Sequence, residues 1–235
     1  MRATLILLSF LTANLSISQS QQYHSKNFIA YHSNDIEHYW INKCISTLEN
    51  IYESLGEIFN YFPKKPISVI IYSKTWQFTQ ATKLPYHIGA IFDGTLKIQH
   101  PKILHKKKIL KSILTHEYTH IIINEITKRK IPLWFNEGLA SYIANQNYFF
   151  KFQTKIKSFN ELNQLLTNKK SKQQLQYAYS ISLKIIKHLI NKYSFSKILK
   201  LLHHVNTTNS FNKSFKIIYN FKLIDLENHF FHTKN

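Results

Sequence analysis

The sequence is poor in cysteine and in long apolar runs, and each shortage excludes a kind of protein. Its one cysteine, Cys44, cannot form an internal disulfide, so no covalent crosslink within the chain holds the fold. Beyond the N-terminus, no segment is long and apolar enough to span a bilayer. Disorder is also excluded, because 44% of the 235 residues are hydrophobic and 14% are aromatic. This length suits one well-buried core, or at most two small domains.

Arginine and acidic residues are also scarce. The 31 basic residues outnumber the 12 acidic ones and give a formal charge of +19, which invites a nucleic-acid interpretation. Arg2 and Arg129 are the only arginines, however, and base readout and bidentate phosphate recognition favour the planar guanidinium. With four glycines and many Ile, Asn, Phe and Tyr residues, the composition indicates A/T-biased codons. We therefore expect no specific nucleic-acid partner, and only weak electrostatic association with anionic surfaces.

The N-terminus has the layout of a secretory signal peptide. Arg2 provides a short positive region, an apolar stretch runs from Leu5 to about Leu15, and small residues follow it. The alternative is an N-terminal membrane anchor, but about 11 apolar residues fall short of the roughly 20 that a spanning helix needs. We expect residues 1–20 to be a cleaved signal peptide and the mature protein to be secreted or periplasmic, in the cell envelope.

The first half of the chain combines one long helical pattern with several strand patterns. After a polar N-terminal arm at 21–34, apolar residues at helical spacing predict a helix over 35–62. Short strands are predicted at 67–73, at about 87–92 and at 95–99. Ser73 can cap a short helix after the first of these strands, and Asp93 and Gly94 form a turn between the other two.

The second half of the chain is helical in pattern. A long helix is predicted over 103–127, a second one ends near Asn145, and helical periodicity continues from 158 to 232. Breaks in the last stretch are expected near residues 168–171, 193–194 and 206–210. Because the strands come early and the helices late, we expect an α+β fold. We expect it to be a single domain over 35–235, with a sheet-and-helix part at 67–145 and a helical C-terminal subdomain at 158–232.

Within the helix predicted over 103–127, the segment "SILTHEYTHIIIN" places two histidines one turn apart. His116 and His120 lie on one stripe with Ile109, Ile113 and Ile123, so they face the core. A histidine without a partner there would carry a desolvation cost, which either hydrogen bonds or a metal ion would remove. Zn²⁺ suits neutral imidazole. Glu117 is rotated by about 100° from His116, within reach of a water at such a site without being a ligand.

A catalytic zinc needs a third protein ligand and an open position. The segment "PLWFNEGLASY", residues 132–142, provides Glu137 at the start of a new helix, and a break at 130–132 lets the chain reverse. A glutamate in the first turn is also favoured by the helix dipole alone, which is the alternative explanation. The neighbouring residues favour Glu137 as a metal ligand, because Asn136 and Gly138 beside aromatic residues are unusual in a purely solvated turn.

Together, these motifs resemble those of the gluzincin metallopeptidases. HEYTH, followed after sixteen residues by the glutamate of W-F-N-E-G-L-A, is most similar to the peptidase MA-like families, and W-F-N-E-G also resembles the aminopeptidase branch. The close resemblance covers 112–145, and a looser one extends from about 67 to 230. It implies a zincin-like fold in which His116, His120 and Glu137 hold Zn²⁺ and Glu117 is the general base.

The resemblance also implies where a peptide would bind. In such folds an edge strand beside the active-site helix pairs with the substrate backbone, and residues 87–92 fit that place. The substrate-binding residues are then expected to be Gly89, Ala90 and Ile91. The aminopeptidase branch carries G-A-M-E-N on this strand, and its glutamate holds the free amine of the substrate. Because the stretch here is Gly89-Ala90-Ile91-Phe92-Asp93, without that glutamate, an endopeptidase is expected rather than an aminopeptidase.

Two supporting positions differ from the pattern or stay open. Thermolysin-like relatives have an aspartate four residues after the ligand glutamate to orient a histidine, and Ser141 stands there in this chain as a weaker acceptor. Gluzincins usually add a downstream tyrosine or histidine that stabilises the oxyanion, and Tyr177 is at the comparable place. The alternatives are Tyr179, His203, His204, and a packing role for each of these residues.

The sequence therefore predicts a zinc-dependent endopeptidase that acts on peptide or protein substrates. The alternative is a catalytically inactive relative in which the zinc site only holds a binding module together. The intact Glu117 favours the enzyme, because a structural site has no use for a base beside its ligands. A nucleic-acid-binding or surface-binding protein would rest on the net charge alone.

Overall fold

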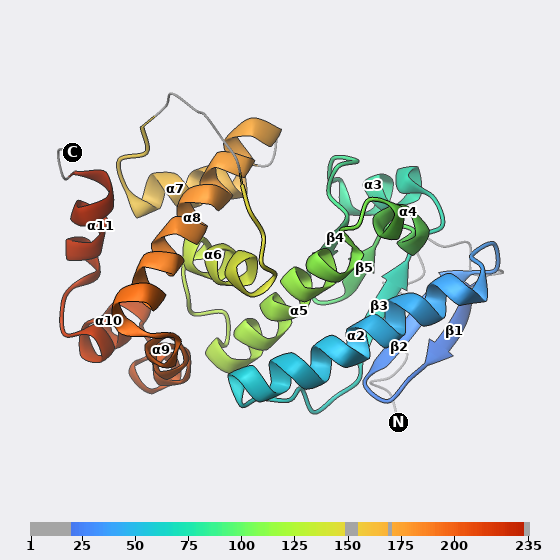
Figure 1. Cartoon of the computed structure of the whole chain (residues 1–235), viewed down its shortest axis with the longest axis horizontal. Coiled ribbons are helices and arrows are strands. Elements are labelled where there is room, and N and C mark those ends of the chain that lie inside the picture. Colours follow the sequence, from blue (N-terminus) through green and yellow to red (C-terminus); the bar gives the residue numbers. More distant parts are fainter. Residues whose placement is uncertain (1–19, 149–154, 169–170, 233–235) are drawn as a thin grey trace, which may run out of the picture. The chain divides into compact units, whose positions relative to one another are not determined.

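The computed structural model describes residues 20–148, 155–168 and 171–232, which include both strands and helices. A small sheet near the N-terminus is followed by many helices, so the fold is mixed α+β (Figure 1). The chain forms two compact units, one of Met1–Glu57 with Phe62–Tyr118 and one of Ile58–Tyr61 with Thr119–Asn235. The single domain expected over 35–235 stays a prediction. The predicted signal peptide, apart from Ser20, lies outside the described residues.

The first unit is built on a five-stranded sheet with the order β1-β2-β3-β5-β4 (Figure 1). The strands are β1 Ser20–His24, β2 Phe28–Ser33, β3 Ile67–Ile71, β4 Ala90–Phe92 and β5 Leu96–Ile98. The pairs β2/β3 and β3/β5 are parallel, whereas β1/β2 and β4/β5 are antiparallel. The last three strands confirm the strand predictions in position, although β4 covers only the second half of the range predicted over 87–92, and β4 lies at an edge of the sheet.

Residues 21–34, expected as a polar arm, instead form most of β1 and all of β2. In β2 the side chains of Phe28, Ala30 and His32 are buried and alternate with less buried neighbours, which is the period of a strand with one face in the core. This alternation was masked by polar residues around it. The polar strand β1 has no such signal of its own and is ordered by pairing with β2.

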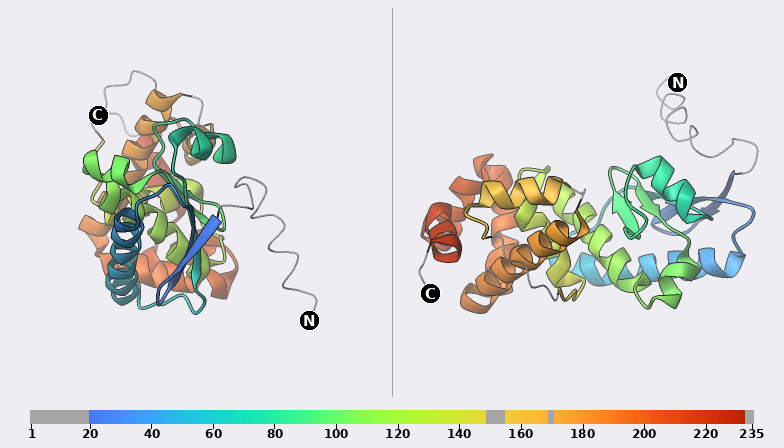
Figure 2. Two further views of the ribbon diagram at one scale, coloured as in Figure 1. Left: turned by 90° about the vertical axis from the view of Figure 1, so that its right-hand side faces the viewer. Right: turned by 90° about the horizontal axis from the view of Figure 1, so that it is seen from above.

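Helices cover both faces of this sheet. Phe28 of β2 contacts Tyr52 of α2 (His38–Phe59) and Tyr118 of α5 (Leu110–Thr127), with ring centroids 6.3 and 6.1 Å apart. On the opposite face, Tyr72 packs on Phe78 of α3 (Thr75–Thr82) at 5.9 Å. Figure 2 shows the sheet and its helices from two further directions. The sheet therefore has a core on each side, and α5 lies over one of them.

Two helix boundaries in this unit differ from the prediction. The helix expected over 103–127 is two helices, α4 Pro101–Lys106 and α5, because Lys108 adopts a left-handed conformation with φ of 58°. The interruption is so short that the apolar period continues across it, which is why the sequence pattern missed it. Ser73 does not cap α3 directly; its Oγ donates to Oε1 of Gln77 at 3.0 Å, and Lys74 occupies the cap position.

The second unit is helical in the part that the structure describes. Its elements are α6 Leu133–Ile143, α7 Phe159–Thr167, α8 Lys172–Tyr193, α9 Phe195–Thr208, α10 Phe211–Tyr219 and α11 Leu223–Phe231. The predicted breaks are present, and Asn145 ends α6 with φ of 50°. A further break follows Asn220, whose φ of 63° also suits an asparagine after a helix. The sequence pattern missed this one because apolar Phe221 follows directly.

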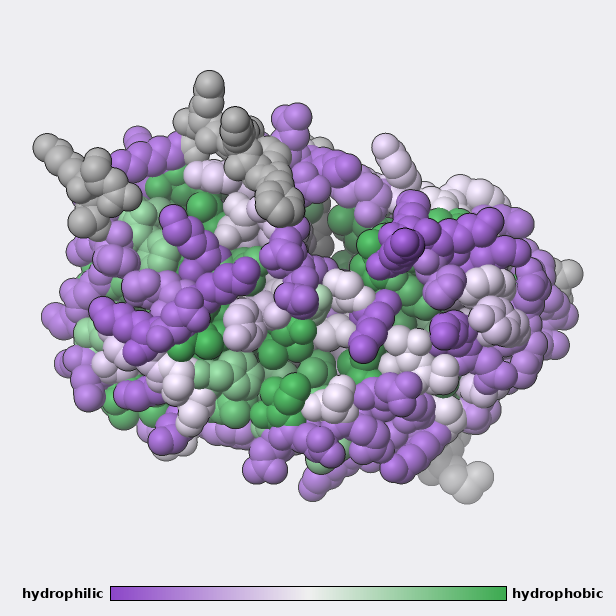
Figure 3. Space-filling view, viewed as in Figure 1, coloured by the Kyte–Doolittle hydropathy of each residue, from purple (hydrophilic) through white to green (hydrophobic). Residues whose placement is uncertain are grey.

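The surface agrees with a chain rich in lysine. Hydrophilic side chains cover most of the face drawn in Figure 3, with smaller apolar areas among them. None of the helices described is long and apolar enough to cross a membrane. Cys44 is a buried free thiol on α2, and burial raises its pKa to about 12.

Candidate metal centre

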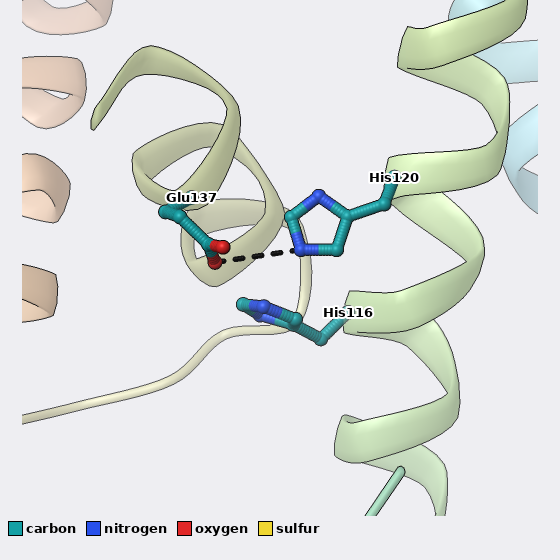
Figure 4. Close-up of side chains that lie close together, drawn as sticks. All are labelled: His116, His120 and Glu137. Atoms are coloured by element: carbon teal, nitrogen blue, oxygen red, sulfur yellow. Dashed lines mark ion pairs between the residues drawn. The ribbon is translucent and has the colours of Figure 1, made fainter. Parts of the chain in front are cut away.

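The helix α5 carries His116, Glu117 and His120 in its central turns. From Tyr118 to Ile123 every residue of the helix is buried, so this half is packed on all sides rather than along one stripe. His116 and His120 are themselves 8% and 9% exposed. Their side chains project from successive turns in the same direction (Figure 4). A packed helix thus fixes the backbone positions of both histidines.

Glu137 is brought to the histidines by α6, the helix that begins directly after Pro132. The N-terminus of α6 is held by Asn163, whose Oδ1 accepts a hydrogen bond from the N–H of Trp134 at 2.9 Å. Trp134 is fully buried and stacks on Phe159 at 4.4 Å. Next to Glu137, a Cβ on Gly138 would lie 2.5 Å from the carbonyl oxygen of Ser182 in α8, so only glycine allows this close helix packing.

The three side chains converge on one point. One ligand atom from each of His116, His120 and Glu137 can be chosen so that all lie within 4.8 Å of one another. Nε2 of His120 and Oε2 of Glu137 are 3.4 Å apart (Figure 4). A tetrahedral zinc with bonds of about 2.0–2.2 Å separates its ligand atoms by roughly 3.4 Å. His120 and Glu137 belong to the same compact unit, and His116 lies one turn earlier on the same continuous helix.

Asn136 determines the tautomer of His120, so that the nitrogen facing Glu137 carries no proton in the neutral ring. Nδ2 of Asn136 donates to Oδ1 of Asn124 at 3.3 Å, which leaves Oδ1 of Asn136 to accept from Nδ1 of His120 at 2.9 Å. In the neutral ring Nε2 is then an acceptor, and it faces a carboxylate oxygen that is also an acceptor. Two acceptors at 3.4 Å repel each other unless a proton or a metal ion lies between them. The donor set therefore fits a metal ion, with neutral imidazole as a ligand.

Glu117 lies partly exposed beside the edge strand β4. Its Oε2 accepts a hydrogen bond from the main-chain N–H of Phe92 at 2.8 Å. The structure thus brings the predicted general base to the strand predicted to bind a substrate. No pattern in the sequence indicates this contact, because the donor is a backbone group 25 residues away.

Pairing with β5 narrows the substrate-binding prediction for β4. Gly89 and Gln99 share a ladder hydrogen bond of 2.9 Å, and Ile91 lies opposite Lys97 in the same register. Because bonded and non-bonded pairs alternate in an antiparallel ladder, the main chains of Gly89 and Ile91 face β5. Of the three predicted residues, only Ala90 turns its backbone groups outward.

The remaining predicted residues have other contacts. Tyr177 lies on α8, where burial raises the pKa of its hydroxyl. A main-chain hydrogen bond from Ile156 opposes this shift without reversing it. Tyr179 stacks on Tyr148 at 5.7 Å, and Ser141 is within hydrogen-bond distance of the Tyr148 hydroxyl at 3.0 Å. His203 and His204 line a cavity of about 550 Å³ that runs along α9, from Ser196 to Thr207. The oxyanion role of Tyr177 stays a prediction.

The comparison with known families agrees with this geometry. A family model described as the peptidase MA superfamily matches residues 54–233, which are 180 of the 235 residues. The chain belongs to the peptidase MA superfamily. A search of curated proteins gave no significant match. Within this superfamily the cluster of His116, His120 and Glu137 is a group that could hold a metal ion.

Proposed function

We propose that the protein is a zinc-dependent endopeptidase of the gluzincin type with a zincin-like fold. The observation that carries this proposal is the convergence of His116, His120 and Glu137 within 4.8 Å, with Glu117 adjacent on the same helix. Two imidazoles and one carboxylate with an open position are the ligand set of several catalytic zinc sites. Membership of the peptidase MA superfamily supports peptide hydrolysis as the reaction.

The residues divide the chemistry among them. Zinc, when bound, supplies a Lewis acid that polarises a carbonyl and lowers the pKa of water. Asn136 keeps His120 in the tautomer that presents Nε2 as a ligand atom. Glu117 accepts a proton from the attacking water and returns it to the nitrogen of the leaving amine. Tyr177 is our candidate for stabilising the oxyanion.

The substrate is proposed to be a peptide bound as an extra strand on the edge of β4. The outward N–H and C=O of Ala90 and the outward C=O of Phe92 are suited to pair with it, as in other cases of strand addition. The position occupied by glutamate in G-A-M-E-N is Phe92 here, so no carboxylate at that position can hold a free amine. We therefore infer cleavage inside chains, and expect peptides with blocked N-termini to be cleaved.

Export is proposed on the N-terminal sequence alone. A protein cleaved near residue 20 and recovered outside the cytoplasm should begin between Gln19 and Gln22, as read by N-terminal sequencing. Met1 at the start of exported material would favour a membrane anchor instead. Weak binding to anionic surfaces is a proposed by-product of the net charge of +19.

The variant Glu117→Gln tests the proposed function. It keeps the size of the side chain and an oxygen that can accept the N–H of Phe92, but it removes the base. We expect zinc content and folding close to those of the wild type, and kcat lower by about 10²–10⁴ or more on a blocked peptide. If Glu117→Gln and the wild type cleaved equally well, the mechanism would be wrong. An inactive wild type that holds zinc would favour the alternative of a zinc-stabilised binding protein.

A further inference from the structure

The contact between β4 and Glu117 joins the strand proposed to bind a peptide to the residue proposed as the general base. The main-chain N–H of Phe92 donates to Oε2 of Glu117 at 2.8 Å, and both residues belong to the same compact unit. Phe92 is the last residue of β4, the strand proposed to bind a peptide, whereas Glu117 is the proposed base on α5. The base carboxylate is therefore held by the strand's own backbone.

The alternation of β4 explains why this N–H points away from β5. Gln99 donates to Gly89 and Asp93 donates to the carbonyl of Thr95, so the residues at 89, 91 and 93 form the bonded pairs of the ladder. The pairs at 90 and 92 are then the non-bonded ones, whose N–H and C=O groups face outward. The hydrogen bond from Phe92 to Glu117 therefore replaces none of the hydrogen bonds between β4 and β5.

Packing fixes β4 close enough to α5 for this bond. A Cβ on Gly89 would lie 2.5 Å from Cδ1 of Ile113, a residue one turn before Glu117 on α5. The buried side chain of Gln99 donates from Nε2 to the carbonyls of Tyr86 and Ile88, at 2.9 and 2.7 Å, which holds the segment before β4. The distance between the donor and the carboxylate is thus determined by a glycine contact and a buried amide.

We propose that the N–H of Phe92 positions the carboxylate of Glu117 for proton transfer, so that the substrate-binding strand also orients the base. This inference rests on the proposed function. A glutamate side chain has three rotatable bonds, and one charge-assisted hydrogen bond to Oε2 selects the direction in which the carboxylate faces. A carboxylate has about four acceptor sites, so this bond leaves capacity for a water.

The same bond determines the register of the substrate. The Phe92 N–H is occupied by Glu117, so the outer edge of β4 offers a peptide the N–H and C=O of Ala90 and the C=O of Phe92. The substrate therefore pairs with β4 only as far as Phe92, beside the carboxylate of Glu117. The peptide group opposite Phe92 is the one that lies beside Glu117, and it is the one that is hydrolysed.

Amide hydrogen exchange tests the contact without any activity measurement. In the zinc-loaded full chain, the Phe92 amide should be protected in the wild type and in Glu117→Gln, which retains an acceptor oxygen. In Glu117→Ala it should exchange at least about tenfold faster. The outward amide of Ala90 is the internal control and should exchange equally in all three proteins. Equal exchange of the Phe92 amide in all three would overturn the proposal.

Kinetics test the positioning role. Phe92→Pro removes the N–H, and proline is tolerated on an edge strand where the N–H faces outward. Phe92→Ala removes the same ring but keeps the N–H, so the difference between these variants isolates the hydrogen bond. We expect kcat of Phe92→Pro to be about 10- to 100-fold below that of Phe92→Ala, with similar KM and zinc content. Ala90→Pro removes an outward N–H that does not hold Glu117, and we expect it to raise KM instead.

The outcomes separate this inference from the proposed function. If the wild type cleaves a blocked peptide and Glu117→Gln does not, but Phe92→Pro and Phe92→Ala have the same kcat, the enzyme stands and the positioning role is overturned. If the wild type cleaves no peptide, the proposed function is overturned and the positioning role falls with it. The exchange rates then report only whether the contact itself forms.

Discussion

The ligand side and the strand side of the candidate site are assembled in different ways. The ligand side consists of His116, His120 and Glu137, which lie on two consecutive helices within 22 residues of sequence, from 116 to 137. The strand side consists of β4 and its contact with Glu117. It requires a sheet in which β5 pairs with both β3 and β4, so that β4 becomes an edge. The first is specified by a short motif and the second by the tertiary structure.

The two sides are also held by different interactions. Glu137 and its neighbours are fixed by side-chain packing, with Trp134 fully buried and Gly138 pressed against α8. The three-residue strand β4 is held in the sheet mainly by main-chain hydrogen bonds to β5, and only its approach to α5 is set by the contact of Gly89 with Ile113. Changes on the ligand side should therefore alter metal binding and stability, whereas changes on the strand side should alter turnover and substrate binding.

The largest expected effect is loss of zinc from ligand variants. The purified protein should hold about one Zn²⁺ per chain, and His116→Ala, His120→Ala and Glu137→Ala should each lose most of it, because each leaves two protein ligands. Metal analysis after dialysis against a weak chelator measures this. The matched control is Glu125→Ala. Glu125 also lies on α5, but its carboxylate accepts a hydrogen bond from the hydroxyl of Tyr61, so this variant should keep its zinc.

Glu137→Ala is the decisive variant of this set. The two histidines follow each other on one helix, so they would remain close whatever the third ligand is. If Glu137→Ala bound zinc as tightly as the wild type, the third ligand would lie elsewhere and the gluzincin assignment would fail.

A smaller effect is expected one step outward from the ligands, at Asn136. Asn136→Ala keeps all three ligands but removes the acceptor of Nδ1 of His120, so the ring loses its preferred tautomer and orientation. We expect zinc affinity to fall by about 10- to 100-fold, measured by competition with a chromophoric chelator. Asn124→Ala, which removes only the partner of Asn136, should have a weaker effect in the same direction. An unchanged affinity in Asn136→Ala would show that packing alone orients His120.

The ligand side could be predicted because its information is local. The spacing of His116 and His120 by four residues places both on one helical face whatever the rest of the fold. Glu137 required one more assumption, that the chain reverses at Pro132, and α6 begins at the residue after it. Asn136 was visible beside Glu137, but its role depends on Asn124 on another helix, which no spacing rule indicates.

The strand side could be predicted only in outline. The turn at Asp93 and Gly94 indicated two paired strands, and φ of 113° at Gly94 shows why glycine stands there. Which residues of β4 face outward depends on a register that pairs Ala90 with Ile98, and a shift by one residue would exchange them. The strands β1 and β2 were missed for a related reason, since β1 is polar and becomes a strand only through its partner.

The smallest expected effect compares one glycine from each side. Gly138→Ala would place a Cβ 2.5 Å from the backbone oxygen of Ser182, whereas Gly89→Ala would place one 2.5 Å from the flexible end of Ile113. A backbone atom within a helix cannot move aside, so α6 and α8 would have to separate. The packing energy lost when these helices separate should outweigh the gain in helix propensity of about 1 kcal/mol. We therefore expect a net destabilisation of about 1–3 kcal/mol.

In Gly89→Ala a rotamer change of Ile113 relieves most of the contact, so we expect a loss below about 1 kcal/mol. Denaturant unfolding of both variants against the wild type, at equal zinc occupancy, measures the difference in the free energy of unfolding. A larger loss for Gly89→Ala than for Gly138→Ala would mean that β4 is held against α5 more rigidly than α6 is held against α8. The ligand side would then not be the more tightly packed of the two, and the contrast between packing and main-chain hydrogen bonding would be wrong.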